Sequence, residues 1–375
     1  MTSSEDFLIR NGVLAVYKGY GGLVEVPEGV TKIGREAFSG CAGLERVTLP
    51  ESVTEIGYQA FAGCAGLRRV NLPAGLKRLD IGAFSDCAAL TEIAILDGLT
   101  SVSQRLFSGC SALTRVTLPE GITRIGPFAF ARCQRLTGIN LPAGLAAIGQ
   151  NAFTGCGDLS HISIPEGITE LSTGLFSSCH GLIGVTLPKG LKKIGMEAFG
   201  GCSNLTEISL PEELEEIGPV AFSNCIRLAR ITLPEGLKKL GLGAFGHCKA
   251  LREITVPEGV AQLEHELFNE CAALERVRLP SHLTQLPEHL LLRCEALADL
   301  QADGVPLAGL PDSRCKRAAA VNFARRTVEG ETFPEDRRAE FIKYIRSQKK
   351  KLAPLATNHP ELRQFMAAEH IEIPE

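Results

Sequence analysis

Apolar and polar residues alternate over a short stretch of the chain, and the same arrangement then returns many times. Within residues 44–50, Val47 and Leu49 are apolar while Arg46 and Thr48 are polar, which is the two-residue period of a half-buried strand. The proline that follows has no N–H to donate, so it ends the hydrogen-bonded ladder. The pattern therefore predicts one short strand in each repeat.

The rest of the repeat is a second apolar pair and a turn. Val53 and Ile56 precede a glycine, and a turn through Phe61 then leads to Cys64. The cysteine recurs every 23 residues without insertion or deletion, and a leucine follows three residues after each one. The cysteines of the repeat are Cys41, Cys64, Cys87, Cys110, Cys133, Cys156, Cys179, Cys202, Cys225, Cys248, Cys271 and Cys294. Twelve units of one register thus occupy about residues 21–302.

A single 23-residue circuit cannot bury its own apolar side chains. Circuits stacked about 4.8 Å apart allow each Leu, Ile, Phe and Cys to pack on its counterparts above and below. Thirteen strands, beginning with residues 24–26, would form a parallel sheet roughly 55 to 60 Å long at that spacing. We therefore expect one elongated domain rather than two or three globules.

The repeat resembles a known family. The unit reads L-x-x-I-x-L-P-x-x-L-x-x-I-G-x-x-A-F-x-x-C, which is similar to the BspA-type leucine-rich repeat, and residues 7–14 and 17–22 are similar to that family's N-terminal cap. The resemblance implies an α/β repeat fold, a right-handed leucine-rich-repeat solenoid with one parallel sheet of about 13 short strands. It also implies protein binding, in a family common in host-associated bacteria and often displayed at the cell surface.

The extent of the repeat divides the chain into three parts. We expect an N-terminal cap over residues 1–23, a solenoid of twelve coils over 24–302, and a C-terminal helical cap or tail over 303–375. In the tail, Asp312 begins one predicted helix, and Pro334 begins a second that carries Leu352. A third short helix is expected near His359.

Composition and charge limit the partners and the location that we expect for the protein. Its 39 basic and 43 acidic side chains give a net charge of −4, so no global field draws it to nucleic acid or to a membrane. The chain has neither a secretory signal nor an apolar run that could span a bilayer. We expect a cytoplasmic protein without a membrane partner.

The cysteines are better explained as core residues than as zinc ligands or disulfide partners. Zinc sites use closely spaced pairs, and stacked coils hold the Cβ atoms farther apart than the roughly 3.8 Å that a disulfide prefers. A G-x-G-x-x-G match at residues 241–246 falls on core positions of the repeat rather than between a strand and a helix. We find no motif for a cofactor, a metal or a catalytic nucleophile, and we expect neither enzyme activity nor a small-molecule substrate.

The exposed columns of the strand face are the leading candidate for a binding site. One column is rich in small polar residues, and its neighbour mixes charged residues with Gly138 and Gly184, which open a shallow stretch of sheet. We expect a protein partner to lie across this face near coils five to eight; the alternative is a merely solvated surface. The predicted contact residues are Arg46, Arg69, Arg115, Thr117, Asn140, His161, Ser163, Thr186, Arg230 and Thr232.

The tail offers a second candidate surface. From residue 312 to residue 375 it has thirteen basic and ten acidic side chains. Five cations could contact phosphate, namely Lys343, Arg346, Lys349, Lys350 and Lys351. The alternative is a solvated charge run that suits the dipole at a helix end.

Three functions follow from these surfaces. The leading hypothesis is a non-catalytic scaffold that binds a protein through the strand face. The second is a nucleic-acid-associated or regulatory protein that binds through the tail helices. The third is a bacterial surface adhesin.

Overall fold

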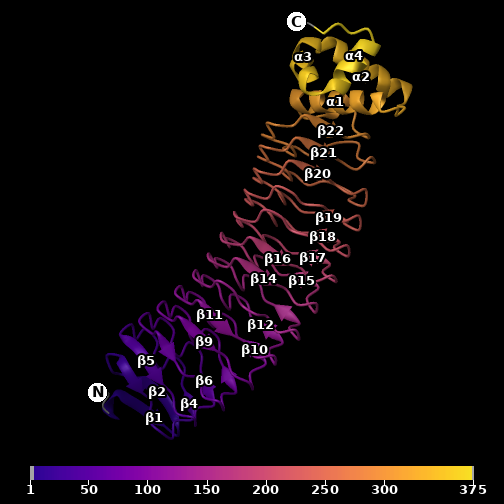
Figure 1. The fold of residues 1–375 in the computed structure, drawn as a ribbon. Helices are drawn as coiled ribbons and strands as arrows, with labels where there is room; N and C mark the ends of the chain where they lie inside the picture. Colours follow the sequence, from indigo (N-terminus) through magenta and orange to yellow (C-terminus); the bar gives the residue numbers. More distant parts are fainter. Residues whose placement is uncertain (1–3, 374–375) are drawn as a thin grey trace.

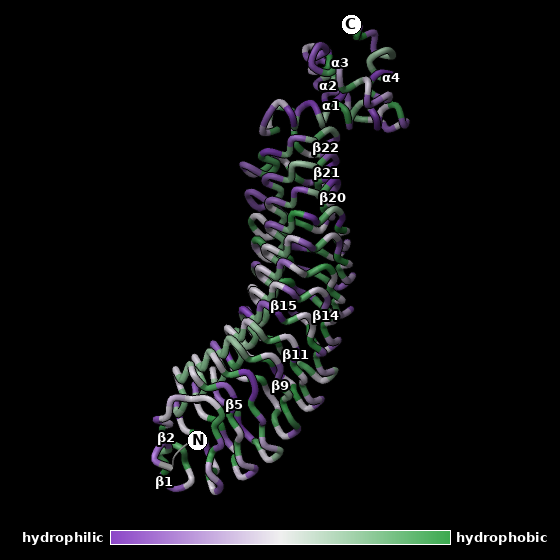
Figure 2. Tube along the Cα trace, turned by 60° about the vertical axis from the view of Figure 1, so that its left-hand side comes forward, coloured by the Kyte–Doolittle hydropathy of each residue, from purple (hydrophilic) through white to green (hydrophobic). Residues whose placement is uncertain are grey.

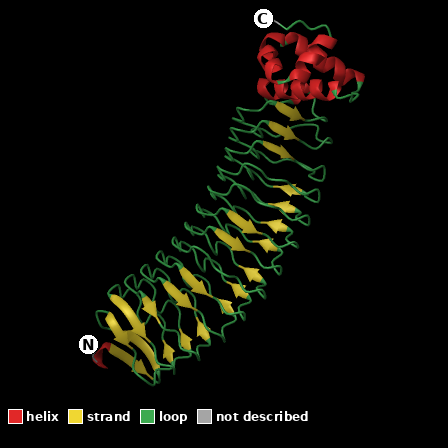
Figure 3. Cartoon of the chain, viewed as in Figure 1, coloured by secondary structure: helices red, strands yellow, loops and turns green. Residues whose placement is uncertain are grey.

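The repeated coils stack into an arched rod with helices at its C-terminal end (Figure 1; Figure 3). The computed structural model describes residues 4–373. Figure 2 shows hydrophobic and hydrophilic segments alternating within the coils. The rod is a parallel β-solenoid of about 13 turns, so the fold predicted from the repeat is confirmed.

The predicted strand forms the first of two strand rows. Its strands pair in parallel in the register of the repeat, as in Arg115↔Glu92 and His161↔Gly184. They are β3 (Gly22–Glu25), β5 (Leu44–Thr48), β7 (Arg69–Val70), β9 (Glu92–Ala94), β11 (Arg115–Thr117), β14 (His161–Ser163), β16 (Gly184–Thr186), β20 (Glu253–Thr255), β21 (Arg276–Arg278) and β22 (Asp299–Gln301). Residues 138–140, 207–209 and 230–232 occupy the same place in their coils without forming strands, and only Glu207↔Arg230 makes an isolated bridge.

A second strand row runs through the second apolar pair of the repeat, so the expectation of one strand per coil was wrong. Its strands are β4 (Lys32–Ile33), β6 (Glu55–Ile56), β8 (Arg78–Leu79), β10 (Ser101–Val102), β12 (Arg124–Ile125), β13 (Ala147–Ile148), β15 (Glu170–Leu171), β17 (Lys193–Ile194), β18 (Glu216–Ile217) and β19 (Lys239–Leu240). Each is two residues long, because only one side chain of the pair points inward before the chain turns at the following residue. Such a short segment has too little alternation to be recognised as a strand from sequence.

The phenylalanine ladder forms the centre of the core. Ring centroids from Phe38 to Phe268 follow one another at 4.8 to 5.9 Å, and every neighbouring pair is stacked. Tyr17 extends the ladder at the N-terminal end, 4.9 Å from Phe38. Stacked aromatic rings contribute attraction beyond their buried area, so the ladder fixes the register between coils.

The cap that supplies Tyr17 is a hairpin. A short 3-10 helix (Ser4–Asp6) leads into β1 (Phe7–Arg10), which pairs antiparallel with β2 (Val13–Tyr17). The other edge of β2 pairs in parallel with β4. The hairpin therefore covers the edge of the second strand row.

The cysteines are free thiols that hydrogen-bond to the backbone. From Cys64 to Cys294, each Sγ lies 3.1 to 3.3 Å from the carbonyl oxygen of the phenylalanine 26 residues earlier. Burial raises the pKa of these thiols, in Cys64 and Cys179 to about 12, so they remain protonated and can donate. Each cysteine thus ties its coil to the preceding one.

The tail contains four helices where the sequence predicted three. They are α1 (Ser313–Val328), α2 (Glu335–Ser347), α3 (Lys349–Asn358) and α4 (Pro360–Ala368), after a 3-10 turn at Leu307–Gly309. Asp312 caps α1 as predicted, because its side chain accepts hydrogen bonds from the backbone N–H groups of Arg314 and Cys315. The second predicted helix divides at Gln348, so Leu352 belongs to α3.

The tail helices cover the last coil. Helix α1 lies against β22, and Asn322 donates to the Asp299 carboxylate at 2.6 Å. Arg326 bonds to Asp303 at 2.6 Å, and Arg337 donates to the carbonyl of Ala302 at 3.1 Å. No helix within residues 4–373 is long and apolar enough to span a membrane.

Candidate partner-binding groove

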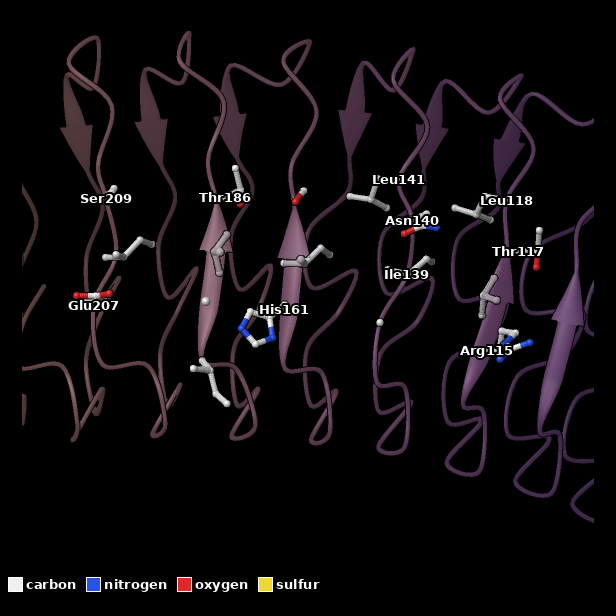
Figure 4. Close-up of a pocket in the computed structure, with 18 of the residues that line it drawn as sticks. Arg115, Thr117, Leu118, Ile139, Asn140, Leu141, His161, Thr186, Glu207 and Ser209 are labelled. Atoms are coloured by element: carbon white, nitrogen blue, oxygen red, sulfur yellow. The ribbon is translucent and has the colours of Figure 1, made fainter.

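A groove lies across the first strand row where the contact residues cluster (Figure 4). It has a volume of about 1170 Å³ and extends from β11 across residues 138–140, β14 and β16 to residues 206–209. Strand alternation builds it, because Val116 and Ile162 point into the core while Arg115, Thr117 and His161 are exposed. Six predicted residues line it together: Arg115, Thr117, Asn140, His161, Ser163 and Thr186.

The floor of the groove has an interruption in the strand ladder at residues 138–140. Ser160 still donates its N–H to the Thr137 carbonyl at 3.4 Å just before this segment. Within the described chain, however, no backbone hydrogen bond joins Gly138, Ile139 or Asn140 to a neighbouring coil. The backbone donors and acceptors of these residues therefore have no partner in a neighbouring coil.

Asn140 differs from the asparagine at the same position of an earlier coil. The Asn71 amide bonds to the Leu49 backbone in both directions, at 2.8 Å to the N–H and 2.9 Å to the carbonyl. Among residues 4–373 the Asn140 side chain has no such partner. The same residue type thus holds two coils together at Asn71 and is available for binding at Asn140.

Gly184 makes room for the His161 ring. A Cβ atom on Gly184 would lie 3.1 Å from His161 Cδ2, which is closer than most real contacts of a Cβ atom. The imidazole lies between β14 and β16 in Figure 4. A Cβ on Gly138 would instead meet nothing within 4 Å, so this glycine leaves open space.

The charged residues of the groove lack the ion pairs made elsewhere in their column. Arg69 pairs with Glu92 at 3.6 Å, and Arg276 pairs with Glu253 at 2.8 Å. In the part of the chain that the structure describes, Arg115 and Glu207 form no ion pair. The groove therefore has the unpaired guanidinium of Arg115 in its first coil, which also contributes the Glu120 carboxylate, and the unpaired carboxylate of Glu207 in its last coil.

The remaining predicted contact residues lie outside the groove. Arg230 and Thr232 line a neighbouring hollow of about 330 Å³ that begins at Glu207. Arg69 lines a smaller hollow of about 250 Å³ on the other side, which includes Arg115. Arg46 is exposed on β5, beyond these hollows.

Sequence reasoning missed the apolar rim of the groove. Ile183 is 48% exposed there, and Leu118 and Leu141 are half-buried on the opposite side. Ile183 comes directly before β16, and it is an apolar residue at a position where the repeat mostly has polar ones. This departure from the repeat could have indicated the rim from sequence. The rim gives a bound segment apolar contact beside its polar floor.

The cations of the tail lie near the junction of α2 and α3. Lys343, Arg346, Lys350 and Lys351 are exposed. Lys349–Lys351 form the first turn of α3, at the positive pole of its dipole, and they also directly follow the C-terminal end of α2, which has Arg346 in its last turn. Cations are unfavourable at the first pole and favourable at the second, so the fit of this charge run to a helix end stays a prediction.

The described residues show no metal site. No group of three or more His, Cys, Asp or Glu side chains within them could hold a metal ion. The free thiols are rungs of the core, with only Cys41 less than fully buried.

Comparison with known sequences identifies the family. The BspA type leucine rich repeat region, a pattern of six copies, matches residues 22–133, 79–195 and 172–298, which together cover more than half of the chain. The chain belongs to the BspA-type leucine-rich repeat family. No curated protein matches it.

Solved structures similar to this BspA-type protein include bacterial leucine-rich repeat proteins. The pneumococcal vaccine antigen PcpA is 19% identical over 79% of this chain and 84% of its own, with a TM-score of 0.50. A leucine rich cell surface protein of Faecalibacterium prausnitzii is 25% identical over 81% of this chain and 92% of its own, with a TM-score of 0.47. The leucine rich repeat protein of T. pallidum is 28% identical over 60% of this chain and 90% of its own, with a TM-score of 0.38.

Proposed function

We propose that this protein is a non-catalytic scaffold that binds an extended segment of a protein partner in the groove between Arg115 and Glu207. The observation that carries the proposal is the coincidence of free side chains with an open strand ladder. Asn140 and its unpaired backbone lie one coil from the unpaired Arg115 and three coils from the unpaired Glu207. At the same position of an earlier coil, the Asn71 side chain instead holds two coils together.

The dimensions of the groove suit an extended chain. Four steps of about 4.8 Å separate the coil of Arg115 from that of Glu207, or about 19 Å, which is about six residues of extended peptide. The floor is formed by a rigid stack of coils, so binding orders few groups of the scaffold and costs little entropy.

The charges at the two ends set the direction of the bound segment. An acidic group of the partner fits beside Arg115, and a basic group fits beside Glu207. Between them, Asn140 can both donate and accept hydrogen bonds with a polar backbone.

Selection of peptides tests this proposal. Peptides enriched from a random displayed library on the intact chain should bind a variant carrying Arg115→Glu and Asn140→Leu at least about tenfold more weakly, since they lose one charge pair and several hydrogen bonds. Thr255→Ala, in the same column but outside the groove, is the matched control and should keep full binding. Equal binding to all three proteins, or no enrichment, contradicts the proposal.

We also propose a cytoplasmic location. Thirteen free cysteines fit a reducing compartment, where thiols are kept from forming disulfides. Fractionation of the native cell tests this, and recovery of the protein at the cell surface would instead favour the adhesin.

A second candidate function rests on the tail. Four exposed cations and the unfavourable position of Lys349–Lys351 at the positive pole of α3 favour binding of phosphate groups, including those of nucleic acid. Retention on heparin should fall when Lys349, Lys350 and Lys351 are replaced by Gln, and unchanged retention rejects this function.

A further inference from the structure

The second strand row carries a surface distinct from the groove, which we call the ridge. It consists of three columns of exposed or partly exposed residues over four successive coils, at the level of β15 (Glu170–Leu171), β17, β18 and β19. The first column is Thr169, Lys192, Glu215 and Lys238; the second is Glu170, Lys193, Glu216 and Lys239; the third is Thr173, Met196, Pro219 and Leu242. Met196 and Leu242 are 48% and 45% exposed.

The charges of the ridge alternate in sign along the solenoid. Lys193 lies 3.7 Å from Glu170 and 3.5 Å from Glu216, and all three side chains remain partly exposed. The alternation stops at both ends of the ridge, because the second column continues as Ala147 on one side and Gln262 on the other. Contacts between coils explain the alternating charges but leave the exposed Met196 unexplained.

We propose that the ridge binds a second copy of this chain, with the two solenoids antiparallel. A two-fold axis parallel to the strands, placed between β17 and β18, makes every column face itself in reverse order. Lys193 then faces Glu216 of the partner subunit, and Glu170 faces Lys239 of the partner subunit.

The other two columns match in the same register. In the first column, Lys192 faces Glu215 of the partner subunit. In the third, Met196 faces Pro219 of the partner subunit, so apolar residues meet beside the charges. One axis position thus satisfies all three columns, and a copy shifted by one coil would place like charges opposite each other.

The ridge is small for a protein interface. Four coils at about 4.8 Å extend less than 20 Å along the rod, so the buried area falls below the roughly 1,200 Å² of a standard interface. The dimer is therefore weak, concentration-dependent and sensitive to salt, because exposed ion pairs are screened. It also leaves the groove on the first strand row unoccupied, so the ridge is independent of the proposed function.

Sedimentation over a concentration series of the intact chain tests the proposal. We expect a reversible monomer–dimer equilibrium that weakens with added salt. Lys193→Glu should raise the dissociation constant at least about tenfold, because it places two carboxylates opposite each other. Adding Glu216→Lys to that variant restores opposite charges across the axis and should restore the dimer.

A second variant examines the apolar column. Met196→Glu should abolish the dimer, whereas Gln104→Glu, in the same column but outside the ridge, should leave it unchanged. Thermal unfolding of each variant checks that the solenoid is intact. A chain that stays monomeric up to its highest soluble concentration overturns the proposal, and so does a dimer that the charge exchange fails to restore.

Discussion

At the residue scale, the cysteine of the repeat has two functions in the core. It fills a small apolar position, as the 23-residue spacing predicted, and its thiol also donates to a phenylalanine carbonyl of an earlier coil. The spacing identified the buried position because every coil places a cysteine there. The hydrogen bond could not be predicted, because it depends on how far adjacent coils are offset.

The buried thiols make stability depend on pH in the alkaline range. An unfolded thiol loses its proton above its ordinary pKa of 9, whereas burial raises the pKa of Cys64, Cys179 and Cys248 to about 12 in the folded chain. Unfolding therefore releases protons between these values, and stability is full below pH 9 and falls as the pH rises towards 12.

Thermal unfolding followed between neutral and alkaline pH measures this loss. The buried thiols should also stay unreactive towards Ellman's reagent in the folded chain, with the less buried Cys41 reacting first. Rapid reaction of all the thiols in the native protein contradicts the account.

Val220 is a strained residue in a turn of the coil. It has a φ of 47°, which is rare for a β-branched side chain, and the next coil has Gly243 with a φ of 57° at the same position. Val220→Gly should stabilise the chain by about 1 kcal/mol, as relief of the strain outweighs the added freedom of the unfolded chain. Gly243→Val is the matched reverse change and should destabilise it; equal melting temperatures for the two variants reject the explanation.

At the scale of elements, the solenoid combines a continuous core with an interrupted surface. The phenylalanine ladder runs unbroken from Phe38 to Phe268, while the first strand row breaks at residues 138–140 and again at 207–209 and 230–232. Periodicity predicted the core and the exposed columns, including Asn140. It could not distinguish Asn140 from Asn71, since the two residues share a column and the structure gives only Asn71 hydrogen bonds to the backbone of the preceding coil.

The interruption should be visible in hydrogen exchange. The backbone N–H groups of Ile139 and Asn140 have no partner in a neighbouring coil, so they should exchange much faster than those within the paired strands β14 and β16. Exchange measured residue by residue on the free chain gives the comparison. Equal protection across residues 138–140 and 161–163 would show that the ladder is closed there.

Asp303 is a shared contact at the junction between tail and solenoid. Asp303 faces both Arg326 and Arg337, which are largely buried between the last coil and the helices. Asp303→Ala leaves these guanidinium groups without their shared partner and should cost about 1 to 3 kcal/mol. Proteases should then cut faster between α1 and α2, with Glu253→Ala as the control at an exposed ion pair.

At the scale of the whole molecule, the rod separates its surfaces by row and by end. The groove lies on the first strand row, the ridge on the second, and the cations at the C-terminal helices. A partner in the groove and a second copy on the ridge can therefore bind to one chain together. The extent of the repeat predicted this elongated shape, and Gly138 and Gly184 indicated an open stretch of sheet near the groove. The unpaired state of Asn140 and Arg115 could not be predicted, because it depends on contacts between coils.

The most direct measurement of the central claim is site-specific crosslinking of the partner. A photoreactive residue placed at Asn140 should capture a peptide selected on the intact chain, whereas the same residue at Thr255 should not. Capture at Asn140 alone is the result that the proposed groove predicts. Capture at Thr255 or at Lys350 without capture at Asn140 would place the partner elsewhere and contradict the account.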